Sequence, residues 1–235
     1  RMLDRHPRVR SAGELMDFKQ LLSDAAAEAH GRHPQLSRVQ AALHIDFAAL
    51  GREYLRGARE AADGAEVFID KMPVNFMYCG LIAKALPRAK IVHLVRDPMD
   101  SCYAVFKTLF QQAYFFSYEQ QALADYYAAY RRLMRHWQSV LPGRILDLRY
   151  EDLVSDTASQ ARRLLEFCGL DWNDAVLAPD ANARPSTTAS AAQVREPVHA
   201  RSVGRWRSVA EGLEPLRQRL QAHGLVDAEG RAIEA

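Results

Sequence analysis

Three short, apolar segments separated by helical patterns constrain the fold of this chain more than any other feature. They are Glu66–Asp70, Lys90–Val95 and Arg144–Leu148. Strands this short and this apolar are typical of a parallel sheet that is buried on both faces. Strands that alternate with helices imply an α/β fold with right-handed crossovers. We therefore expect a parallel sheet flanked by helices.

Apolar residues at helical spacing fill the segments around these strands. Asp97 and Pro98 precede one such segment, as an N-cap followed by proline in the first turn. Gly169 and Gly224 follow two others, at the place where glycine commonly ends a helix. The helices predicted on these grounds are Asn75–Leu86, Met99–Phe110, Glu119–Leu141, Asp156–Cys168 and Leu213–His223.

The two ends of the chain show weaker patterns. The first ~60 residues are predicted to be mostly helical. Residues 178–200 look irregular, and residues 225–235 are expected to form a loose tail. A length of 235 residues suits one domain or two.

Composition excludes several classes of protein. The 31 Lys and Arg residues against 29 Asp and Glu residues leave a net charge of +2, so overall charge gives no support to nucleic-acid binding. No apolar run reaches the ~20 residues that span a bilayer, and no secretory signal is visible. The three cysteines show no C-x-x-C spacing, which argues against a disulfide framework and a structural zinc site. We expect a cytoplasmic protein with no metal and no nucleic-acid or membrane partner.

Charged residues follow each predicted strand: Lys71, Arg96 and Arg149. In an open parallel sheet, ligands bind beyond the carboxyl ends of the strands. The helix after Arg96 adds free backbone N–H groups and the positive end of its dipole. These features predict an anion site, most simply a phosphate site, although solvated loop charges are the plainer alternative.

Motifs of other nucleotide and hydrolase sites are missing from the sequence. There is no G-x-x-x-x-G-K-[ST] loop, so an intact P-loop nucleotidase is not supported. Neither G-x-G-x-x-G nor G-x-S-x-G occurs, which weakens the dinucleotide-binding and hydrolase interpretations.

A co-linear set of motifs resembles a known family. It comprises DKMPVNF at Asp70–Phe76, KIVHLVRDPMDSCYAVFKTLF at Lys90–Phe110, YEDL at Tyr150–Leu153, QVREPV at Gln193–Val198 and SVGRW at Ser202–Trp206. The chain resembles sulfotransferases that use 3′-phosphoadenosine 5′-phosphosulfate (PAPS). It is most similar to the bacterial domain often found behind tetratricopeptide repeats, which is similar to tyrosylprotein sulfotransferases.

The resemblance implies a fold and partners. It implies a P-loop-type parallel sheet flanked by helices, in a single sulfotransferase domain over residues 1–235. The implied co-substrate is PAPS without a metal, and the implied partner is a hydroxyl-bearing peptide, carbohydrate or small molecule. An upstream fusion to tetratricopeptide repeats is a further implication.

The resemblance also implies two catalytic residues. Glu14 matches the carboxylate that acts as general base on the acceptor hydroxyl. Lys71 matches the lysine that steadies charge on the transferring sulfuryl group and the leaving phosphate. Both roles suit the chemistry, because a carboxylate in a largely dry cleft can take the acceptor's proton and a fixed cation can face developing charge. Without the resemblance, Glu14 would be taken as a solvated carboxylate.

Four further residues match positions that bind the donor nucleotide. Arg96 matches the arginine that holds the 3′-phosphate, and Tyr150 a tyrosine that lines the nucleotide site. Ser190 matches a serine near the sulfate and phosphate, and Arg205 a late basic residue that closes over the nucleotide. The alternatives are a core aromatic for Tyr150, a plain loop serine for Ser190 and a surface residue for Arg205.

One departure from the family pattern falls in the 3′-phosphate motif. The family has a serine eight residues after the arginine, and here that position is Ala104. Loss of the hydroxyl contact costs roughly 1–3 kcal/mol if nothing replaces it. Ser101 and Lys107 lie one turn to either side on a similar helix face, so either could substitute as a donor-binding residue.

A second departure is that the family's 5′-phosphosulfate loop and the strand before it do not occur in these residues, which open at Arg1 inside the following helix. We expect the sequence to be an N-terminally truncated fragment that is inactive, or nearly so, by itself. Such a fragment would expose unpaired strand edges and be prone to aggregate.

Three functional hypotheses follow. The first is a PAPS-dependent sulfotransferase. The second is a non-catalytic nucleotide-binding relative that acts as a scaffold or regulatory module, which Ala104 and the missing 5′-phosphosulfate loop favour slightly. The third is an ATP-dependent phosphotransferase, which would need a Mg²⁺ site and a glycine-rich loop. The reading frame upstream of Arg1 would discriminate among them.

Overall fold

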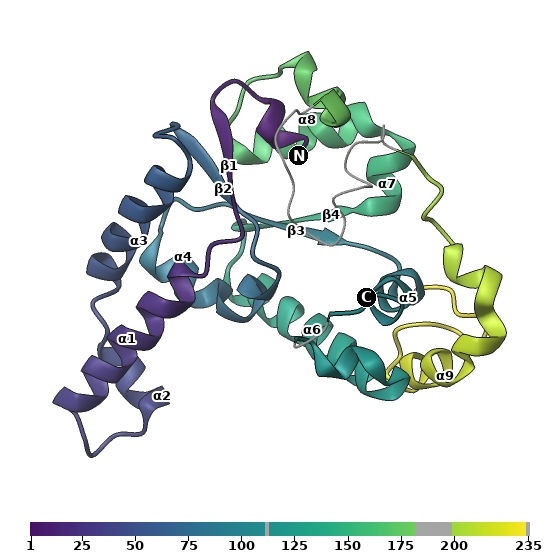
Figure 1. Cartoon of the computed structure of the whole chain (residues 1–235), viewed down its shortest axis with the longest axis horizontal. Helices are drawn as coiled ribbons and strands as arrows, with labels where there is room; N and C mark the ends of the chain where they lie inside the picture. Colours follow the sequence, from purple (N-terminus) through teal and green to yellow (C-terminus); the bar gives the residue numbers. More distant parts are fainter. Residues whose placement is uncertain (111–112, 182–198, 234–235) are drawn as a thin grey trace. The chain divides into compact units, whose positions relative to one another are not determined.

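The computed structural model describes residues 1–110, 113–181 and 199–233, and the chain divides into two compact units. Unit 1 consists of Arg1–Ile91 with Asn173–Asn182, and unit 2 of Val92–Trp172 with Ala183–Ala235. Helices and strands occur in both units (Figure 1), so the prediction of an α/β fold is confirmed. The single domain over residues 1–235 stays a prediction.

Unit 1 is built on two parallel strands, β1 (Val9–Gly13) and β2 (Val67–Asp70). Val9 lies opposite Val67 in the register. β2 was predicted from Glu66–Asp70, whereas β1 was missed because the N-terminal region was taken as mostly helical. The other elements are η1 (Leu3–Arg5), α1 (Asp17–Arg32), α2 (Arg38–Ala41), η2 (Ala42–His44), α3 (Phe47–Ala61), η3 (Pro73–Tyr78), α4 (Cys79–Ala85), η5 (Asp174–Leu177) and η6 (Pro179–Ala181).

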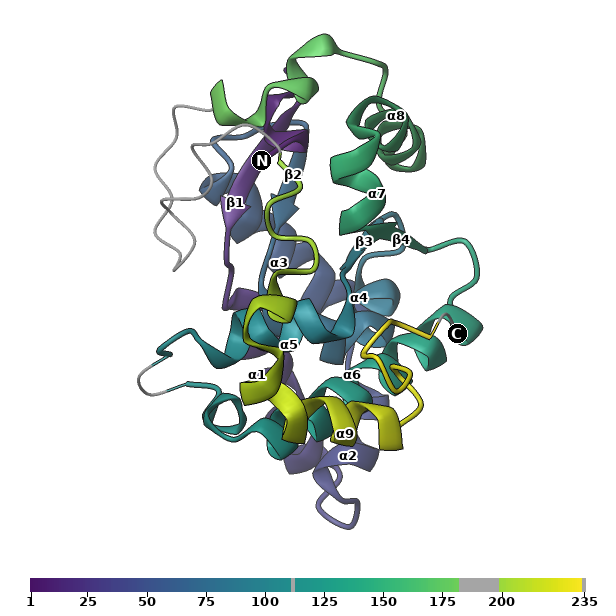
Figure 2. The same ribbon diagram turned by 90° about the vertical axis from the view of Figure 1, so that its right-hand side faces the viewer.

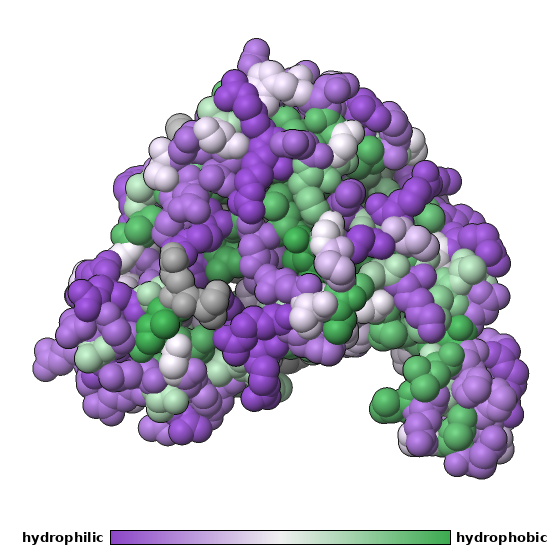
Figure 3. Space-filling model, turned by 180° about the vertical axis from the view of Figure 1, so that it is seen from behind, coloured by the Kyte–Doolittle hydropathy of each residue, from purple (hydrophilic) through white to green (hydrophobic). Residues whose placement is uncertain are grey.

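The core of unit 1 lies where α1, α3 and α4 pack together. Phe18 of α1 meets Tyr54 of α3 edge-on, with ring centroids 5.5 Å apart. At Gly51 of α3, a Cβ would lie 2.1 Å from the carbonyl oxygen of Ala85, so α3 and α4 can approach this closely only with glycine there. The surface of the α1–α2 region carries hydrophobic residues (Figure 3), among which Val39 is 82% exposed.

Unit 2 contains the paired strands β3 (Ile91–Val95) and β4 (Ile145–Arg149), and the unit boundary falls at the start of β3. Both strands were predicted to within a residue. The other elements are α5 (Pro98–Phe106), η4 (Phe115–Tyr118), α6 (Gln120–Val140), α7 (Tyr150–Ser155), α8 (Thr157–Cys168), η8 (Arg205–Leu213) and α9 (Glu214–Ala222).

Capping residues explain why several helices begin where they do. The side chain of Asp97 accepts the Asp100 N–H ahead of α5, and Asp156 accepts the Ser159 N–H ahead of α8. Gly169 follows α8 in the left-handed conformation, as expected of a helix C-cap. Two predicted helices are shorter than expected, because α5 ends at Phe106 and the Asn75–Leu86 segment divides into η3 and α4.

The expectation that the strands are buried on both faces is wrong for β3. Val92 and Leu94 are 37% and 55% exposed, so one face of this strand is open among the described residues. β3 belongs to a sheet of two strands, which covers less of each member than a larger sheet would.

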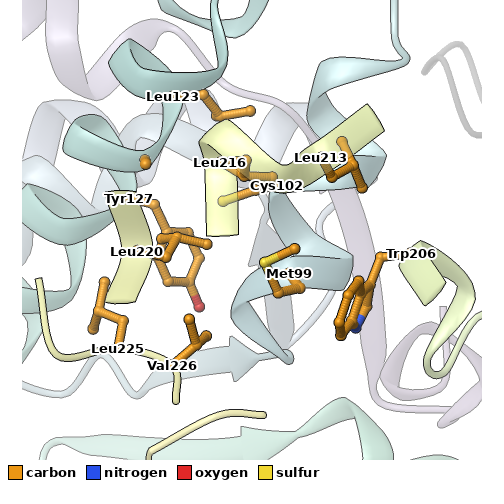
Figure 4. Close-up of a cluster of buried hydrophobic side chains, with 11 residues drawn as sticks. Met99, Cys102, Leu123, Tyr127, Trp206, Leu213, Leu216, Leu220, Leu225 and Val226 are labelled. Atoms are coloured by element: carbon orange, nitrogen blue, oxygen red, sulfur yellow. The ribbon is translucent and has the colours of Figure 1, made fainter. Parts of the chain in front are cut away.

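The core of unit 2 lies among α5, α6 and α9. Figures 1 and 2 both show α9 alongside α6. The buried cluster includes Met99 and Cys102 of α5, Tyr127 of α6 and Trp206 of η8 (Figure 4). No helix in the described part of the chain combines the length and the apolar character needed to cross a membrane.

The segment after α9 differs from the loose tail that we expected. Leu225 and Val226 are buried in the same core, and the Ile233 N–H donates to the Leu225 oxygen at 3.0 Å. The two apolar side chains anchor the segment in the core, and an antiparallel β-bridge pairs Val226 with Ala232.

Candidate active site

In unit 1, Glu14 and Lys71 form an ion pair. Glu14 directly follows β1 and Lys71 directly follows β2. Because the two strands are parallel and adjacent, their carboxyl ends bring together residues that lie 57 positions apart. The two catalytic residues implied by the resemblance therefore meet in space.

A local irregularity in β1 helps to place Glu14. The register between β1 and β2 shifts between Ser11 and Gly13, and Gly13 has a φ of +80°. Glycine adopts this backbone conformation without steric cost. The Lys71 N–H still donates to the Gly13 oxygen at 2.8 Å. The two backbones are therefore hydrogen-bonded directly beside the ion pair.

Asp70, the residue before Lys71, connects the surrounding elements. Its Oδ1 accepts the Leu15 N–H at 3.2 Å, and its Oδ2 accepts the Tyr54 hydroxyl at 2.9 Å and the Asn75 side-chain N–H at 3.0 Å. Burial, followed by the charge of Asp70, raises the pKa of Tyr54. This role of Asp70 was not predicted from the sequence, although the residue lies in the DKMPVNF motif.

The surroundings of the pair differ from the largely dry cleft that we expected. The Lys71 and Glu14 side chains are 58% and 36% exposed. Each charge is thus balanced by its partner and by solvent in this structure.

In unit 2, Arg96 and Tyr150 lie next to each other. Arg96 follows β3 and Tyr150 follows β4, and the Arg96 guanidinium carbon is 5.1 Å from the centroid of the Tyr150 ring. This distance is within the range of a cation–π contact. The Tyr127 hydroxyl of α6 donates to the Arg96 carbonyl oxygen at 3.2 Å, which helps to fix the backbone there.

Arg96, Lys107 and Arg205 form a group of like charges, which we call the cation group. The pKa of Lys107 is lowered, first by desolvation and then by the positive charges of Arg205 and Arg96. These three residues come from the end of β3, from just after α5 and from the start of η8. Repulsion among them would be relieved by a bound anion.

The two remaining donor-binding candidates are Ser101, which the structure describes, and Ser190, which it does not. Ser101 lies in the first turn of α5, where its N–H donates to the Asp97 oxygen at 2.9 Å. Nothing in the described ranges links its hydroxyl to the cation group, to which Lys107 belongs. Ser190 and the QVREPV motif lie outside the described residues.

A buried carboxylate, Asp100 of α5, was missed by the sequence analysis. Its side chain is 1% exposed, and it accepts the Gly204 N–H at 2.5 Å and the Trp206 N–H at 3.1 Å. A charged residue between Met99 and Cys102, on the apolar stripe of a helix, was the signal that could have revealed it.

The aromatic residues after α5 divide between the core and the surface of unit 2. Phe116 stacks on Tyr126 of α6, with centroids 3.6 Å apart, and packs against the core of unit 2. Phe115 and Tyr118 are instead 72% and 43% exposed. Packing thus holds one ring, while two others face solvent.

The cation group also has the chemistry to hold a nucleotide phosphate. The Arg96 Nε is buried, and in the part of the chain that the structure describes it has no hydrogen-bond partner. Arginine presents donors in a planar fork that suits phosphate oxygens. The residues present therefore fit a phosphate-bearing co-substrate.

Comparisons with known proteins identify the family of this chain. The sequence profile described as "Sulfotransferase family" matches residues 1–174. The chain is 31% identical over 228 residues to an uncharacterized protein of Aquifex aeolicus, with 94% of this chain and 30% of that protein covered.

Two named relatives extend the comparison. Omega-hydroxy-beta-dihydromenaquinone-9 sulfotransferase Stf3 of Mycobacterium tuberculosis is 33% identical, over 43% of this chain and 28% of its own length. Protein-tyrosine sulfotransferase 1 of Danio rerio is 25% identical, over 75% of this chain and 50% of its own length. The chain thus spans half or less of the curated relatives that it matches.

A solved structure is similar in fold. The sulfotransferase domain from the Synechococcus PCC 7002 olefin synthase aligns with a TM-score of 0.55 at 18% identity, covering 84% of this chain and 74% of that one. The profile match over residues 1–174 shows that the chain belongs to the Sulfotransferase family.

Proposed function

We propose that this protein transfers a sulfuryl group from PAPS to a hydroxyl of a peptide tyrosine, a carbohydrate or a small molecule. The observation that carries the proposal is the pair of Glu14 and Lys71, which the parallel strands β1 and β2 bring together. A carboxylate beside an ammonium supplies both the base and the cation that sulfuryl transfer needs.

The donor nucleotide is assigned to the cation group of unit 2. Arg96 would bind the 3′-phosphate through its guanidinium, whose Nε is buried and has no hydrogen-bond partner among the described residues, and Lys107 would replace the hydroxyl missing at Ala104. Arg205 would close over the nucleotide, and the Tyr150 ring would line its site beside Arg96. Bound there, the donor supplies the sulfuryl group and a phosphate leaving group.

The chemical step is assigned to unit 1. Glu14 takes the proton of the acceptor hydroxyl as its oxygen attacks. Lys71 carries three N–H donors, so it can remain in contact with Glu14 and also donate to an oxygen on which negative charge develops. Asp70 holds the chain on both sides of this pair through Leu15 and Asn75.

The names of the relatives suggest acceptors to test. One relative is named for a hydroxylated menaquinone derivative and another for protein tyrosine. A phenol, a tyrosine peptide, an aliphatic alcohol and a sugar alcohol would therefore sample the acceptor classes of the proposal.

The proposal is tested by calorimetric titration of the protein at its full natural length. The two ligands are 3′-phosphoadenosine 5′-phosphate and 5′-AMP, which differ in the phosphate that Arg96 should hold. A charge-assisted contact of roughly 1.5–3 kcal/mol predicts at least a tenfold preference for the bisphosphate. Transfer of labelled sulfate from PAPS to the acceptor panel is measured on the same sample.

Each outcome separates the hypotheses. Preference for the bisphosphate with sulfate transfer supports the enzyme. The same preference without transfer to any acceptor supports the non-catalytic nucleotide-binding relative. Equal or absent binding of the two ligands overturns the assignment of the cation group.

A further inference from the structure

The Asp100 carboxylate is buried at an unusual place for a charge. It lies on α5 between two core side chains, Met99 and Cys102, and is 1% exposed. A buried charge is costly unless it is paired and hydrogen-bonded. The partners of Asp100 should therefore show what the charge is used for.

Those partners are two backbone N–H groups of one turn. Oδ2 accepts the Gly204 N–H and Oδ1 accepts the Trp206 N–H, so the two contacts flank Arg205. Gly204 has a φ of +69°, a backbone conformation that favours glycine, and the Arg207 N–H closes the turn on the Gly204 oxygen at 3.1 Å.

A second connection ties the same turn to the end of β3. The Arg96 guanidinium donates to the Ser202 oxygen, and its Nη2 lies 3.9 Å from Oδ2 of Asp100. Residues 202–206 are thus bonded to Arg96 at one end and to Asp100 at the other. The backbone of Arg205 is fixed on both sides while its side chain is exposed.

The charge of Asp100 also acts on the cation group directly. The carboxylate raises the pKa of Lys107, against the lowering by desolvation and by the two arginines. A buried negative charge therefore offsets part of the repulsion among Arg96, Lys107 and Arg205.

We propose that Asp100 is a positioning residue, which holds the turn at residues 202–206 so that Arg205 joins Arg96 and Lys107 in binding a nucleoside bisphosphate. The inference rests on the proposed function, because it takes the donor nucleotide as the ligand. It adds a residue that contacts no ligand and acts chiefly by positioning Arg205, because the direct effect of its charge on Lys107 is the smallest of the influences on that pKa.

The test is a double-mutant cycle at full natural length, with 3′-phosphoadenosine 5′-phosphate as the probe in calorimetry. The four proteins are the wild type, Asp100→Asn, Arg205→Ala and the double variant. Asp100→Asn is expected to weaken binding about tenfold in the wild-type background and by less than about twofold when Arg205 is already absent. Equal losses in both backgrounds would show that Asp100 does not act through Arg205, and would overturn the inference.

A second variant covers the case in which Asp100→Asn does not fold. Gly204→Ala strains the turn without altering the buried carboxylate, because alanine at this φ is unfavourable and its Cβ would lie 2.3 Å from Nη1 of Arg207. Its effect on binding should likewise fall to less than about twofold in the Arg205→Ala background. A loss that persists there overturns the inference.

Two controls separate this inference from the proposed function. Asp156→Asn removes another aspartate that accepts a backbone N–H in unit 2, and it should leave the affinity within about twofold. If the wild type does not prefer the bisphosphate over 5′-AMP, the proposed function fails. If it does, and Arg205→Ala weakens binding while Asp100→Asn and Gly204→Ala do not, the inference alone fails.

Discussion

The two charged clusters of this protein differ in how their charges are balanced. In unit 1, Lys71 and Glu14 neutralise each other at an exposed strand edge. In unit 2, Arg96, Lys107 and Arg205 gather like charges around one buried carboxylate, Asp100. The first cluster already contains its counter-ion, whereas the second has an excess of positive charge that an anion can satisfy.

This difference is consistent with the different tasks that we propose for the two clusters. A pair of opposite charges provides both a proton acceptor and a cation. The first can act as a base and the second can stabilise developing negative charge, so the pair suits a chemical step. An excess of cations suits ground-state binding of phosphate. Variants in unit 1 should therefore change turnover, while variants in unit 2 should change donor affinity.

The largest expected effect is on turnover. Glu14→Gln should lower kcat by about 10²–10⁴-fold, because the acceptor hydroxyl loses its base. The affinity for 3′-phosphoadenosine 5′-phosphate should stay within about threefold, because this nucleotide is assigned to unit 2. Steady-state kinetics and calorimetry on one preparation give both values.

Glu53→Gln is the matched control, since Glu53 is also an exposed, ion-paired glutamate of unit 1. The variant should retain wild-type turnover. Loss of donor affinity in Glu14→Gln without loss of kcat would contradict the division of tasks.

The next effect is on donor affinity. Arg96→Ala should remove the preference for the bisphosphate over 5′-AMP, a loss of about tenfold or more. Arg132→Ala, which removes an exposed arginine of α6, serves as the control. A preference that survives in Arg96→Ala would place the 3′-phosphate elsewhere.

A smaller effect on donor affinity should show whether Lys107 or Ser101 belongs to the donor-binding site. Lys107→Ala should weaken bisphosphate binding about three- to tenfold, whereas Ser101→Ala should change it less than twofold, because the structure links Lys107 and not Ser101 to Arg96 and Arg205. Calorimetric Kd values decide between the two. The reverse ranking would make Ser101 the substitute for the hydroxyl missing at Ala104.

The smallest effect concerns stability rather than function. The guanidinium of Arg219 and the ring of His223 lower the pKa of Asp125 to about 2 by hydrogen bonding. A carboxyl whose pKa is depressed on folding stabilises the protein above its unfolded pKa of about 4, and this stabilisation is lost as the pH falls toward 2.

Asp125→Asn should therefore lower the Tm by about 1–2 °C at pH 7, as for an exposed ion pair. The difference from the wild type should shrink between about pH 4 and pH 2. Thermal unfolding at a series of pH values measures it, and a difference independent of pH would assign the effect to packing.

The sequence was most informative where local patterns decide the structure. β2, β3, β4 and the long helix α6 follow from apolar periodicity, and the cap at Asp97 follows from its residue type. β1 was missed because its five residues include Arg10 and Ser11 and become a strand through pairing with β2, far along the chain.

The candidate site shows the same division. Lys71 and Arg96 were singled out as cations at strand ends, and the resemblance added Glu14 and Arg205 as candidates. That Glu14 contacts Lys71 depends on β1, and that Asp100 bonds to the turn near residue 205 depends on a contact between residues over 100 positions apart. Neither follows from local sequence, because long-range pairing is decided by tertiary packing.

The packing of Trp206 has a practical consequence. Its ring is 4% exposed and lies against Gly230, where even a Cβ would come within 2.7 Å of the indole. The residue next to Arg205 is therefore a buried indole, whereas Trp172 is 37% exposed. Intrinsic tryptophan fluorescence should therefore report on this turn, since a ligand that shifts it would change the fluorescence of the buried Trp206.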